Sequence, residues 1–495
     1  MRMARPSPYA RPAADRQGGT AHPFPTVGGG RYGGPRTEWG MTMSVSDRAA
    51  LERLRSDLHG TIVLEGDPDY DTARQPWNLA VDQRPAAVAT PADVADVQAI
   101  IAAAREGGYG VTTQPNGHGA GGDLAGVILI RPSRFDEIVV DTEARLLRVG
   151  AGVNWGRALE RLDGTGLIGL AGSNPEVNVV GLTINGGQSM FSRRYGIPAR
   201  SIVAVELVDA AGDVRRVTDS DDAELAWALR GGGGLFGVIT AIELALYPGD
   251  ALLGGSLAFP ARNAVDVISA AFELGRDVPE LGLDVGMMQF PDMPLVPPPL
   301  RGQTVATVAL VHVGDEATGR SYADRLISVA EPIADTLTVF TIGSLAAVAA
   351  EPVDPMPNAD FGGAVDTLDA AFAREFVDAF LAGAGHGLMR CSVRTLGGAI
   401  ADDLGAESSV VGAVHAGGFL NAGVLLMDPS LDPVAALQPM RDLVARHRGD
   451  TTVPTFLGLG TTLADAYSAE VVDRLAAVKR RVDPDGIIRS NRPLA

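Results

Sequence analysis

Cysteine and histidine are both scarce in this 495-residue sequence, which contains one cysteine and seven histidines. A single thiol, Cys391, excludes an intramolecular disulfide framework, a zinc site built on cysteines and an iron–sulfur cluster. We expect this thiol to be buried and unreactive. Neither His386 nor His415 has metal-ligand spacing to another histidine, so the sequence predicts no metal site.

The sequence also lacks a cluster of basic residues and a long apolar run. Its formal net charge is -19, whereas binding to a phosphate backbone requires a basic stripe. No run of about 18 apolar residues is present, as a membrane-spanning helix would need, and the first residues lack the apolar segment of a secretory signal. These absences predict no nucleic-acid partner, no membrane partner and a cytoplasmic location.

Regular structure is not expected at the start of the sequence. Residues 1–43 are rich in glycine, proline and arginine, a composition that buries too little apolar surface to fold. We predict a disordered tail there. The first helical pattern begins near Ser46 and runs to Arg55.

Glycine, in contrast, is abundant, with 61 residues, and one glycine-rich loop contains a histidine. The loop reads Gln114-Pro-Asn-Gly-His-Gly-Ala-Gly-Gly122, so His118 lies among residues without bulk. Glycine permits positive φ, and successive N–H groups of such a loop can turn toward one anion, for example a diphosphate. A helical pattern over residues 90–105 precedes the loop, and a short apolar strand over 127–130 follows it. The alternative is a surface turn around an incidental histidine.

This order of helix, Gly-His loop and strand resembles the flavin-binding half of the vanillyl-alcohol oxidase superfamily, and more narrowly its berberine-bridge-enzyme-like branch. The resemblance implies an α+β fold, in which a PCMH-type FAD-binding domain of two subdomains carries an inserted α+β substrate domain. It assigns residues 50–248 to the FAD-binding domain and residues 249–460 to the substrate domain. Residues 461–495 would return to the FAD-binding domain.

The resemblance also gives His118 a chemical role. In the family, the histidine of this loop is bonded covalently to the 8α-methyl group of FAD. The bond requires an unprotonated imidazole as nucleophile, and histidine loses its charge at about pH 6.5. We therefore expect FAD as the cofactor, attached by one covalent bond through His118.

A second glycine-rich stretch, residues 172–196, is too polar and too rich in turn residues for a helix, so we predict a functional or disordered loop. In the family this loop lines the flavin ring and the diphosphate. Asn174 stands where some members have a cysteine bonded to the flavin, which excludes a second covalent bond. Leu182 replaces a common histidine near the flavin N1–C2 region, so the charge of reduced flavin must be stabilised elsewhere or less well. Val177 matches a valine linked to oxygen access.

The resemblance thus predicts a set of cofactor-binding residues in three segments. The first loop contributes Gln114, Pro115, Asn116, Gly117, His118 and Gly119. The second stretch contributes Gly172, Ser173, Asn174, Val177, Gly181, Leu182, Asn185, Gly186 and Gly187, and a third segment contributes Gly237 and Val238.

The third segment contains a GxGxxG pattern at Gly232, Gly234 and Gly237, which in a Rossmann fold binds a dinucleotide. Here a predicted helix over 221–230 precedes the glycines and a predicted strand over 238–246 follows them, which reverses the Rossmann order. The segment instead matches a motif of the flavin family, except that Leu235 replaces a usual asparagine. A nicotinamide site is therefore not expected.

The resemblance implies an FAD-dependent oxidoreductase, and an oxidase rather than a dehydrogenase. A hydride would pass from a small organic substrate, such as an alcohol, an amine or a polyketide-like ring, to flavin N5, and O2 would reoxidise the flavin to give H2O2. One alternative is an FAD-linked dehydrogenase with another electron acceptor. The other is a non-catalytic flavoprotein scaffold, motivated by the departures at Asn174, Leu182, Leu235 and Val471.

The catalytic base is predicted from position in the sequence. Tyr467, near the family's C-terminal aromatic position, is the first candidate and His415 is the second. The pattern over residues 465–483 predicts a helix closed by Asp483-Pro484. Neither the identity of the substrate nor the oligomeric state is predicted.

Overall fold

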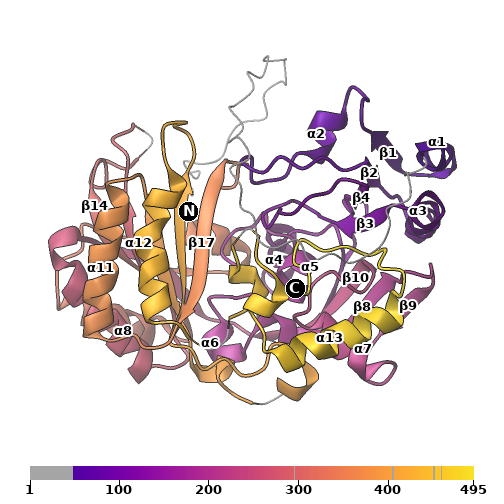
Figure 1. Ribbon diagram of the computed structural model, residues 1–495. Helices are drawn as coiled ribbons and strands as arrows, with labels where there is room; N and C mark the ends of the chain where they lie inside the picture. The colour runs from indigo at the N-terminus through magenta and orange to yellow at the C-terminus, as the bar shows by residue number, and fades with distance from the viewer. Residues whose placement is uncertain (1–47, 295, 404–405, 450–451, 459) are drawn as a thin grey trace, which may run out of the picture.

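The computed structural model describes residues 48–294, 296–403, 406–449, 452–458 and 460–495. The tail predicted to be disordered, residues 1–43, lies outside this range. Within it, helices and strands are mixed, and three larger sheets each carry helices (Figure 1). None of the described helices is both long and apolar enough to cross a membrane.

A four-stranded sheet carries the first glycine-rich loop. Its strand order is β1-β2-β4-β3, in which β2, β4 and β3 are parallel and β1 is antiparallel to β2. Its strands are β1 (Thr61–Leu64), β2 (Ala87–Thr90), β3 (Gly110–Thr113) and β4 (Val127–Ile130), and the helices beside it are α1 (Arg48–Asp57), α2 (Tyr70–Arg74) and α3 (Val94–Gly107). The helix and the strand predicted on either side of the loop are therefore present.

Capping residues explain where α3 begins and ends. The Asp93 carboxylate accepts a hydrogen bond from the backbone N–H of Asp96 at 3.0 Å, which satisfies a free amide of the first turn. The helix ends at Gly108, which is left-handed with φ of 69°. The sequence predicted this helix but placed its start too early.

A five-stranded antiparallel sheet lies beside the first sheet, and its strand order is β5-β6-β10-β8-β9. Its strands are β5 (Ile138–Asp141), β6 (Leu146–Gly150), β8 (Ile202–Val208), β9 (Val214–Val217) and β10 (Val238–Ala245), with a separate pair formed by β7 (Leu167–Ile168) and β11 (Tyr247–Pro248). The helices are α4 (Trp155–Leu162), α5 (Val179–Ile184), α6 (Ser192–Tyr195), α7 (Ala223–Leu229) and, from the C-terminal segment, α13 (Ala469–Val482). Because α7 precedes the GxGxxG glycines and β10 follows them, the segment does not have the Rossmann order, as predicted.

The expectation that residues 172–196 form no helix is wrong, since α5 and α6 lie within them. The Asn178 side chain begins α5 by accepting from the N–H of Gly181 at 2.8 Å, while its amide donates to the carbonyls of Ala151 and Val153 at 2.8 and 2.9 Å. The helix itself is an apolar run that packs into the core. Because polar residues flank this short apolar run, the sequence pattern did not indicate a helix.

An eight-stranded sheet fills most of the predicted substrate domain. Its strand order is β15-β12-β14-β13-β18-β19-β17, and β16 also pairs with β12. The strands are β12 (Leu252–Pro260), β13 (Gly282–Gln289), β14 (Thr304–Val313), β15 (Ala334–Asp335), β16 (Thr338–Phe340), β17 (Asn358–Val365), β18 (Arg390–Thr395) and β19 (Gly418–Leu425). The helices are α8 (Ala264–Asp277), α9 (Glu316–Ile327), α10 (Leu345–Ala349), α11 (Ala370–Ala384) and α12 (Pro433–Arg446). Figure 1 shows α8, α11 and α12 away from α1 and α3, on the outer side of the molecule.

Short 3-10 turns complete the secondary structure. They are η1 (Pro198–Ser201), η2 (Ala261–Asn263), η3 (Ile342–Ser344), η4 (Gly398–Ile400), η5 (Ala406–Ser408), η6 (Pro454–Phe456) and η7 (Leu463–Asp465). Of these, η6 matters most for the site, because its segment passes between the domains and contacts Asn185.

The two faces of the eight-stranded sheet differ in polarity because side chains alternate along each strand. On β18, Cys391 and Val393 are buried against the helices, and burial raises the pKa of the Cys391 thiol, as expected for an unreactive cysteine. The opposite face is here called the polar face, and its residues are Asp284, Asp360, Arg390, Ser392, Arg394 and Asn421. Arg394 donates to the Ser173 hydroxyl at 2.9 Å and to the Gln188 amide oxygen at 2.7 Å. The polar face therefore looks toward the predicted FAD-binding domain.

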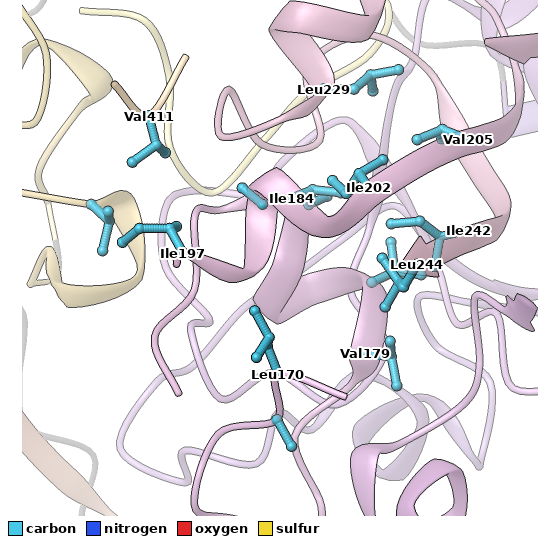
Figure 2. Packing of buried hydrophobic residues seen from close by; sticks show 14 of the residues in the cluster. Leu170, Val179, Ile184, Ile197, Ile202, Val205, Leu229, Ile242, Leu244 and Val411 are labelled. Carbon is cyan, nitrogen blue, oxygen red and sulfur yellow. The ribbon is translucent and has the colours of Figure 1, made fainter. Parts of the chain in front are cut away.

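The two predicted domains share a hydrophobic core. One buried cluster combines the five-stranded sheet and its helices with later residues, among them Val411, Phe419 and Val453. Figure 2 shows Val411 close to Ile184 and Ile197. Separate clusters lie under the helices of the eight-stranded sheet and of the four-stranded sheet. Since burial of apolar surface is the main favourable contribution to folding, the shared cluster fixes the polar face opposite α5.

Buried Arg193 of α6 also joins the two domains. Its guanidinium donates to the carbonyls of Gly275 and Val278 and to the Thr395 hydroxyl, the last at 2.6 Å. Gly275 and Val278 lie at the C-terminal end of α8, where a positive charge is favoured by the helix dipole. Burial lowers the pKa of Arg193 to about 10, so the side chain remains a cation at neutral pH.

The end of the chain returns to the first glycine-rich loop. Ile488 pairs with Val111 as a parallel bridge at the edge of β3, and the Asn491 amide donates to the Gly119 carbonyl at 2.6 Å. The buried Asp483 carboxylate turns the chain out of α13, because it accepts from the N–H of Ile488 at 2.8 Å. The C-terminal segment therefore lies beside β3 and the first glycine-rich loop, although these parts are far apart in the sequence.

Candidate functional site

A cavity of about 300 Å³ lies between the first glycine-rich loop, helix α5 and the C-terminal segment. Its volume is at the lower end of the range of small-molecule sites, about 300–1,000 Å³. Many of the predicted cofactor-binding residues line it, namely Gln114, Pro115, Asn116, Gly117, His118, Gly119, Val177, Gly181, Leu182, Asn185 and Gly237. The structure thus brings the three predicted segments around one space, which we call the large cavity.

The other predicted cofactor-binding residues, Gly172, Ser173, Asn174, Gly186, Gly187 and Val238, do not line the large cavity. The Asn174 amide donates to the Pro352 carbonyl at 2.8 Å, and the Gly187 N–H donates to the Thr455 hydroxyl at 3.0 Å. Val238 is buried at the start of β10. These residues support the cavity wall, and their contact with a cofactor stays a prediction.

The sequence did not predict the contribution of the C-terminal segment to the large cavity. The lining residues missed include Thr112, Thr113, Asn178, Thr455, Arg489, Ser490, Asn491 and Arg492. Two signals were available. Thr112 and Thr113 end the strand before the loop, and ligands of parallel sheets bind at the carboxyl ends of strands. Arg489 to Arg492 directly follow the helix that was predicted to return to this domain.

Several buried polar atoms around the large cavity have no hydrogen-bond partner within the described parts of the chain. They are Gln83 Oε1, Gln114 Nε2, His118 Nε2, Asn185 Oδ1 and Arg492 Nη1. More than about nine-tenths of buried polar groups in folded proteins are paired. Their concentration around one space indicates a polar ligand with both donors and acceptors.

His118 is held in a setting that keeps it neutral. Its ring stacks on Trp77 with centroids 4.4 Å apart and an angle of 17° between the planes. Burial lowers the pKa of His118 to about 4, because a charged imidazole would lose its hydration there. At neutral pH the imidazole is therefore unprotonated, as a nucleophile must be.

Arg131, at the end of β4, anchors the loop of His118. Its guanidinium donates to the carbonyls of Gln114 and Gln75 at 2.8 and 2.9 Å, with longer contacts to Ala73 and Arg74. Burial lowers the pKa of Arg131 to about 10, so it stays charged at neutral pH. One cation thus ties the segment before β2 to the glycine-rich loop.

We predict that the Arg131→Met variant loses about 3 kcal/mol of the free energy of unfolding, because the carbonyls of Gln114 and Gln75 lose their charged donor. Bound cofactor should also dissociate at least tenfold faster, since the loop loses its anchor. Chemical denaturation and cofactor release on dilution measure the two effects. Arg134→Met is the matched control, because Arg134 is exposed three residues away. Equal stability of the two variants would contradict the anchoring role.

A smaller cavity of about 120 Å³ lies between the loop of His118 and the polar face. It shares His118, Gly119, Thr455 and Arg492 with the large cavity. The remaining lining residues are Asn78, Ala120, Asp360, Gly362, Asn421, Phe456, Leu457 and Gly458. The small cavity therefore places Asp360 across a common wall from His118.

Asp360 on β17 is the acidic side chain that lines the small cavity. Asp360 is solvent-exposed at the edge of this cavity, and desolvation by the protein around its carboxyl group raises the pKa of that group. Asn358 donates a hydrogen bond to it, and the charge of Arg390 acts in the opposite direction on its pKa. A carboxylate with a raised pKa beside a cavity is suited to accept a proton.

Comparison with known proteins agrees with this geometry. Residues 85–218 match the family described as FAD binding domain. (R)-6-hydroxynicotine oxidase of Paenarthrobacter nicotinovorans is 25% identical over 460 residues, which cover 88% of this chain and 96% of the relative. In structure, the chain is similar to 6-hydroxy-D-nicotine oxidase of Arthrobacter nicotinovorans, with a TM-score of 0.75, 23% identity and coverage of 88% of this chain and 98% of that one. Berberine bridge enzyme of Eschscholzia californica gives a TM-score of 0.75 at 15% identity, with coverage of 90% and 98%.

The chain carries an FAD-binding domain with the fold of the vanillyl-alcohol oxidase family. The family resemblance and the α+β, PCMH-type fold expected from the sequence are confirmed. At this level of detail, the protein is an FAD-linked oxidoreductase.

FAD fits the unpaired atoms of the large cavity. Its diphosphate and ribityl groups offer acceptors for the free donors of Gln114 and Arg492, and its hydroxyl and ring N–H groups offer donors for the oxygens of Gln83 and Asn185. Gly117 has φ of 86°, a conformation that lets the first glycine-rich loop turn its amides toward an anion.

The two candidate bases do not line either cavity of the FAD-binding domain. Tyr467 is buried in the shared core, and its hydroxyl donates to the Gly231 carbonyl at 2.9 Å. Burial raises the pKa of this phenol, which opposes its ionisation. His415 is exposed in the segment before β19. Neither residue lines a cavity together with His118. Their catalytic roles stay predictions that no contact in the structure supports.

We expect the Tyr467→Phe variant to keep its rate of substrate oxidation within a factor of two and to lose about 1 kcal/mol of the free energy of unfolding, the contribution of one hydrogen bond. Steady-state kinetics and thermal unfolding measure these effects. A rate loss of 100-fold at unchanged flavin content would restore Tyr467 as a catalytic candidate.

Among the described residues, His59, Asp93 and Asp96 could together offer ligands to a metal ion. The Asp96 carboxylate already accepts from the N–H groups of His59 and Gly60 at 2.9 and 2.7 Å, and Asp93 caps α3. The closeness of these three side chains is therefore explained by the hydrogen bonds made at the start of α3.

Proposed function

We propose that this protein is an FAD-linked oxidase of a small organic substrate, which binds between the flavin and the polar face. The observation that carries the proposal is the ring of unpaired polar atoms around the large cavity, with Asp360 across the common wall. The relative named (R)-6-hydroxynicotine oxidase, aligned over most of both chains, supports an oxidase and a small substrate. Bound there, FAD supplies the redox chemistry, because its N5 accepts a hydride from carbon and O2 then reoxidises it to give H2O2.

The FAD-binding loop holds the cofactor in this proposal. The N–H groups around Gly117 and Gly119 bind the diphosphate, and the neutral imidazole of His118 forms a single covalent bond to the 8α-methyl group. The absence of a cysteine at Asn174 leaves this as the one protein–flavin bond. The lowered pKa of His118, about 4, supports its role as nucleophile.

Arg492 supplies the positive charge that Leu182 cannot. It is 6% exposed, and its Nη1 has no partner while Nη2 donates to the Leu457 carbonyl. Its position on the wall common to both cavities supports a role for its charge near the bound flavin. A buried positive charge stabilises negative charge on a nearby group, because little water is present to screen the attraction between the two charges.

Asp360 acts as the base that accepts a proton from the substrate. Loss of a hydride from a carbon that bears a hydroxyl or amino group leaves a positive centre, which a carboxylate relieves by taking the O–H or N–H proton. Asn421 lines the same small cavity, where its side-chain N–H groups can donate to orient such a polar group, while its amide oxygen accepts from Arg390 at 3.1 Å.

The test begins with the visible spectrum of the purified protein, in which flavin gives absorption bands near those of free FAD. Anaerobic addition of substrate should bleach them, and air should restore them with one H2O2 formed for each substrate oxidised. Restoration by a dye acceptor but not by air would favour the dehydrogenase. If no alcohol, amine or phenolic ring compound bleaches the flavin, the non-catalytic scaffold is favoured instead.

A further inference from the structure

Trp77 has a contact with His118 that the proposed function does not use. The stacked indole covers one face of the imidazole, with the centroids 4.4 Å apart. Both imidazole nitrogens lie on the ring edge, which a stacked neighbour leaves free. The Nε2 atom of His118 has no hydrogen-bond partner among the residues that the structure describes. The stack therefore fixes the plane of the ring without occupying the atoms that react.

The backbone on both sides of the indole is bonded to the loop of His118. The Trp77 N–H donates to the Asn116 carbonyl at 2.8 Å, and the N–H of Asn78 donates to the Gly117 carbonyl at 3.4 Å. At Gly117 a Cβ atom would lie 2.6 Å from the Cβ of Pro76. The loop thus lies directly on the segment Pro76 to Asn78, so that Trp77 and His118 are held together.

The substrate domain holds the same segment from the other side. The Trp77 carbonyl accepts from the N–H of Met356 at 3.2 Å, and the Asn78 amide donates to the Asn358 carbonyl at 3.0 Å. Asn358 in turn donates from its N–H to the Asn78 amide oxygen at 3.2 Å. The orientation of the indole therefore depends on residues about 280 positions later in the chain.

We propose that Trp77 is a positioning residue for covalent attachment of FAD to His118, and that the segment of residues 356–358 holds it in place. The inference rests on the proposed covalent bond. In that reaction a C8α–H bond of the flavin methyl group and the imidazole N–H are replaced by a C8α–N bond. Two protons and two electrons are released, and O2 takes them up to form H2O2. A fixed imidazole plane raises the rate because it holds a ring nitrogen toward the methyl carbon.

The experiment compares Trp77→Leu with Trp77→Phe in the full-length protein. Leucine keeps an apolar side chain but has no ring to stack, whereas phenylalanine keeps a stacking ring. Purified proteins are incubated with FAD, precipitated with acid at intervals, and the flavin in pellet and supernatant is measured. We expect the rate of covalent attachment to fall at least tenfold in Trp77→Leu and to recover to within threefold in Trp77→Phe, with similar total FAD.

Controls separate positioning from folding and from the proposed bond itself. Leu79→Ala alters the same segment, whose Leu79 N–H donates to the Met356 carbonyl, and it should attach FAD at the normal rate. Melting temperatures of all variants show whether each is folded. Equal attachment rates in Trp77→Leu and unmodified protein, or equal losses in Trp77→Leu and Trp77→Phe, would overturn the inference alone. Unmodified protein without covalent flavin would overturn the proposed bond.

Discussion

Replacement of Asp360 with asparagine is expected to slow substrate oxidation about 100- to 10,000-fold, the usual contribution of a positioned general base. Asparagine keeps the size and polarity of the side chain but cannot accept a proton. Because Asp360 lines the small cavity and not the large one, the variant should bind as much FAD as the unmodified protein. Rapid anaerobic mixing with substrate measures the rate of flavin reduction directly. Asp366→Asn is the control, since Asp366 lies just after β17 and lines neither cavity.

The pH dependence gives a second readout of the same group. Desolvation of its carboxyl group raises the pKa of Asp360, so the group becomes protonated, and unable to act as a base, at a higher pH than an ordinary aspartate with a pKa of about 3.9. Activity should therefore fall on the acid side with an apparent pKa above that value. The residual activity of Asp360→Asn should lack this acid limb. A variant that kept the limb, or lost less than fivefold in rate, would assign the base elsewhere.

Replacement of His118 with alanine is expected to release all FAD on denaturation. Acid precipitation of the unmodified protein should leave one flavin in the pellet, and in-gel flavin fluorescence should survive, because no cysteinyl bond is present to quench it. His118→Ala should place the FAD in the supernatant while the native protein still binds it, since the rest of the large cavity is unchanged. Substrate oxidation should also slow, because loss of the electron-withdrawing imidazole lowers the flavin potential.

Two controls accompany the His118 variant. His415→Ala should keep the covalent flavin, because His415 is exposed and lines neither cavity. Its rate of substrate oxidation also tests the second candidate base. Free FAD in the supernatant of the unmodified protein would contradict the covalent bond but would leave the FAD-binding domain in place.

The first glycine-rich loop could be predicted as a candidate site because its residue types form a pattern that is visible in the sequence itself. A histidine among four glycines, between a helix and a strand, resembles the loop of the flavin family, although the loop alone is also compatible with a surface turn. The same holds for the glycines before β10, whose reversed order excluded a Rossmann fold. The structure places this loop at the large cavity, and its contact with the cofactor stays a prediction.

Asp360 was missed because its role depends on which face of a strand it occupies. The pattern of β18, with Arg390, Ser392 and Arg394 alternating with apolar residues, did contain the signal for a polar face. The residues next to Asp360 in the sequence do not show that this face lies opposite the loop of His118. That arrangement depends on the shared core, which joins residues far apart in the sequence. For Tyr467 the sequence position matched the family, but the position did not reveal the surroundings of the side chain. In the structure its hydroxyl donates to the Gly231 carbonyl.

The pairing of the C-terminal segment with β3 has a consequence for biosynthesis. Thr112 and Arg489 are bonded across 377 positions, and Asn491 and Gly119 across 372. Contacts of such sequence separation are closed late in folding, because the entropy of closing the intervening loop opposes them until other structure has formed. On the ribosome, domains fold from the N-terminus onward as they are made. The cofactor can therefore be captured only after nearly the whole polypeptide has been translated, and messages truncated before codon 487 should yield protein without flavin even if both sheets of the first domain have formed.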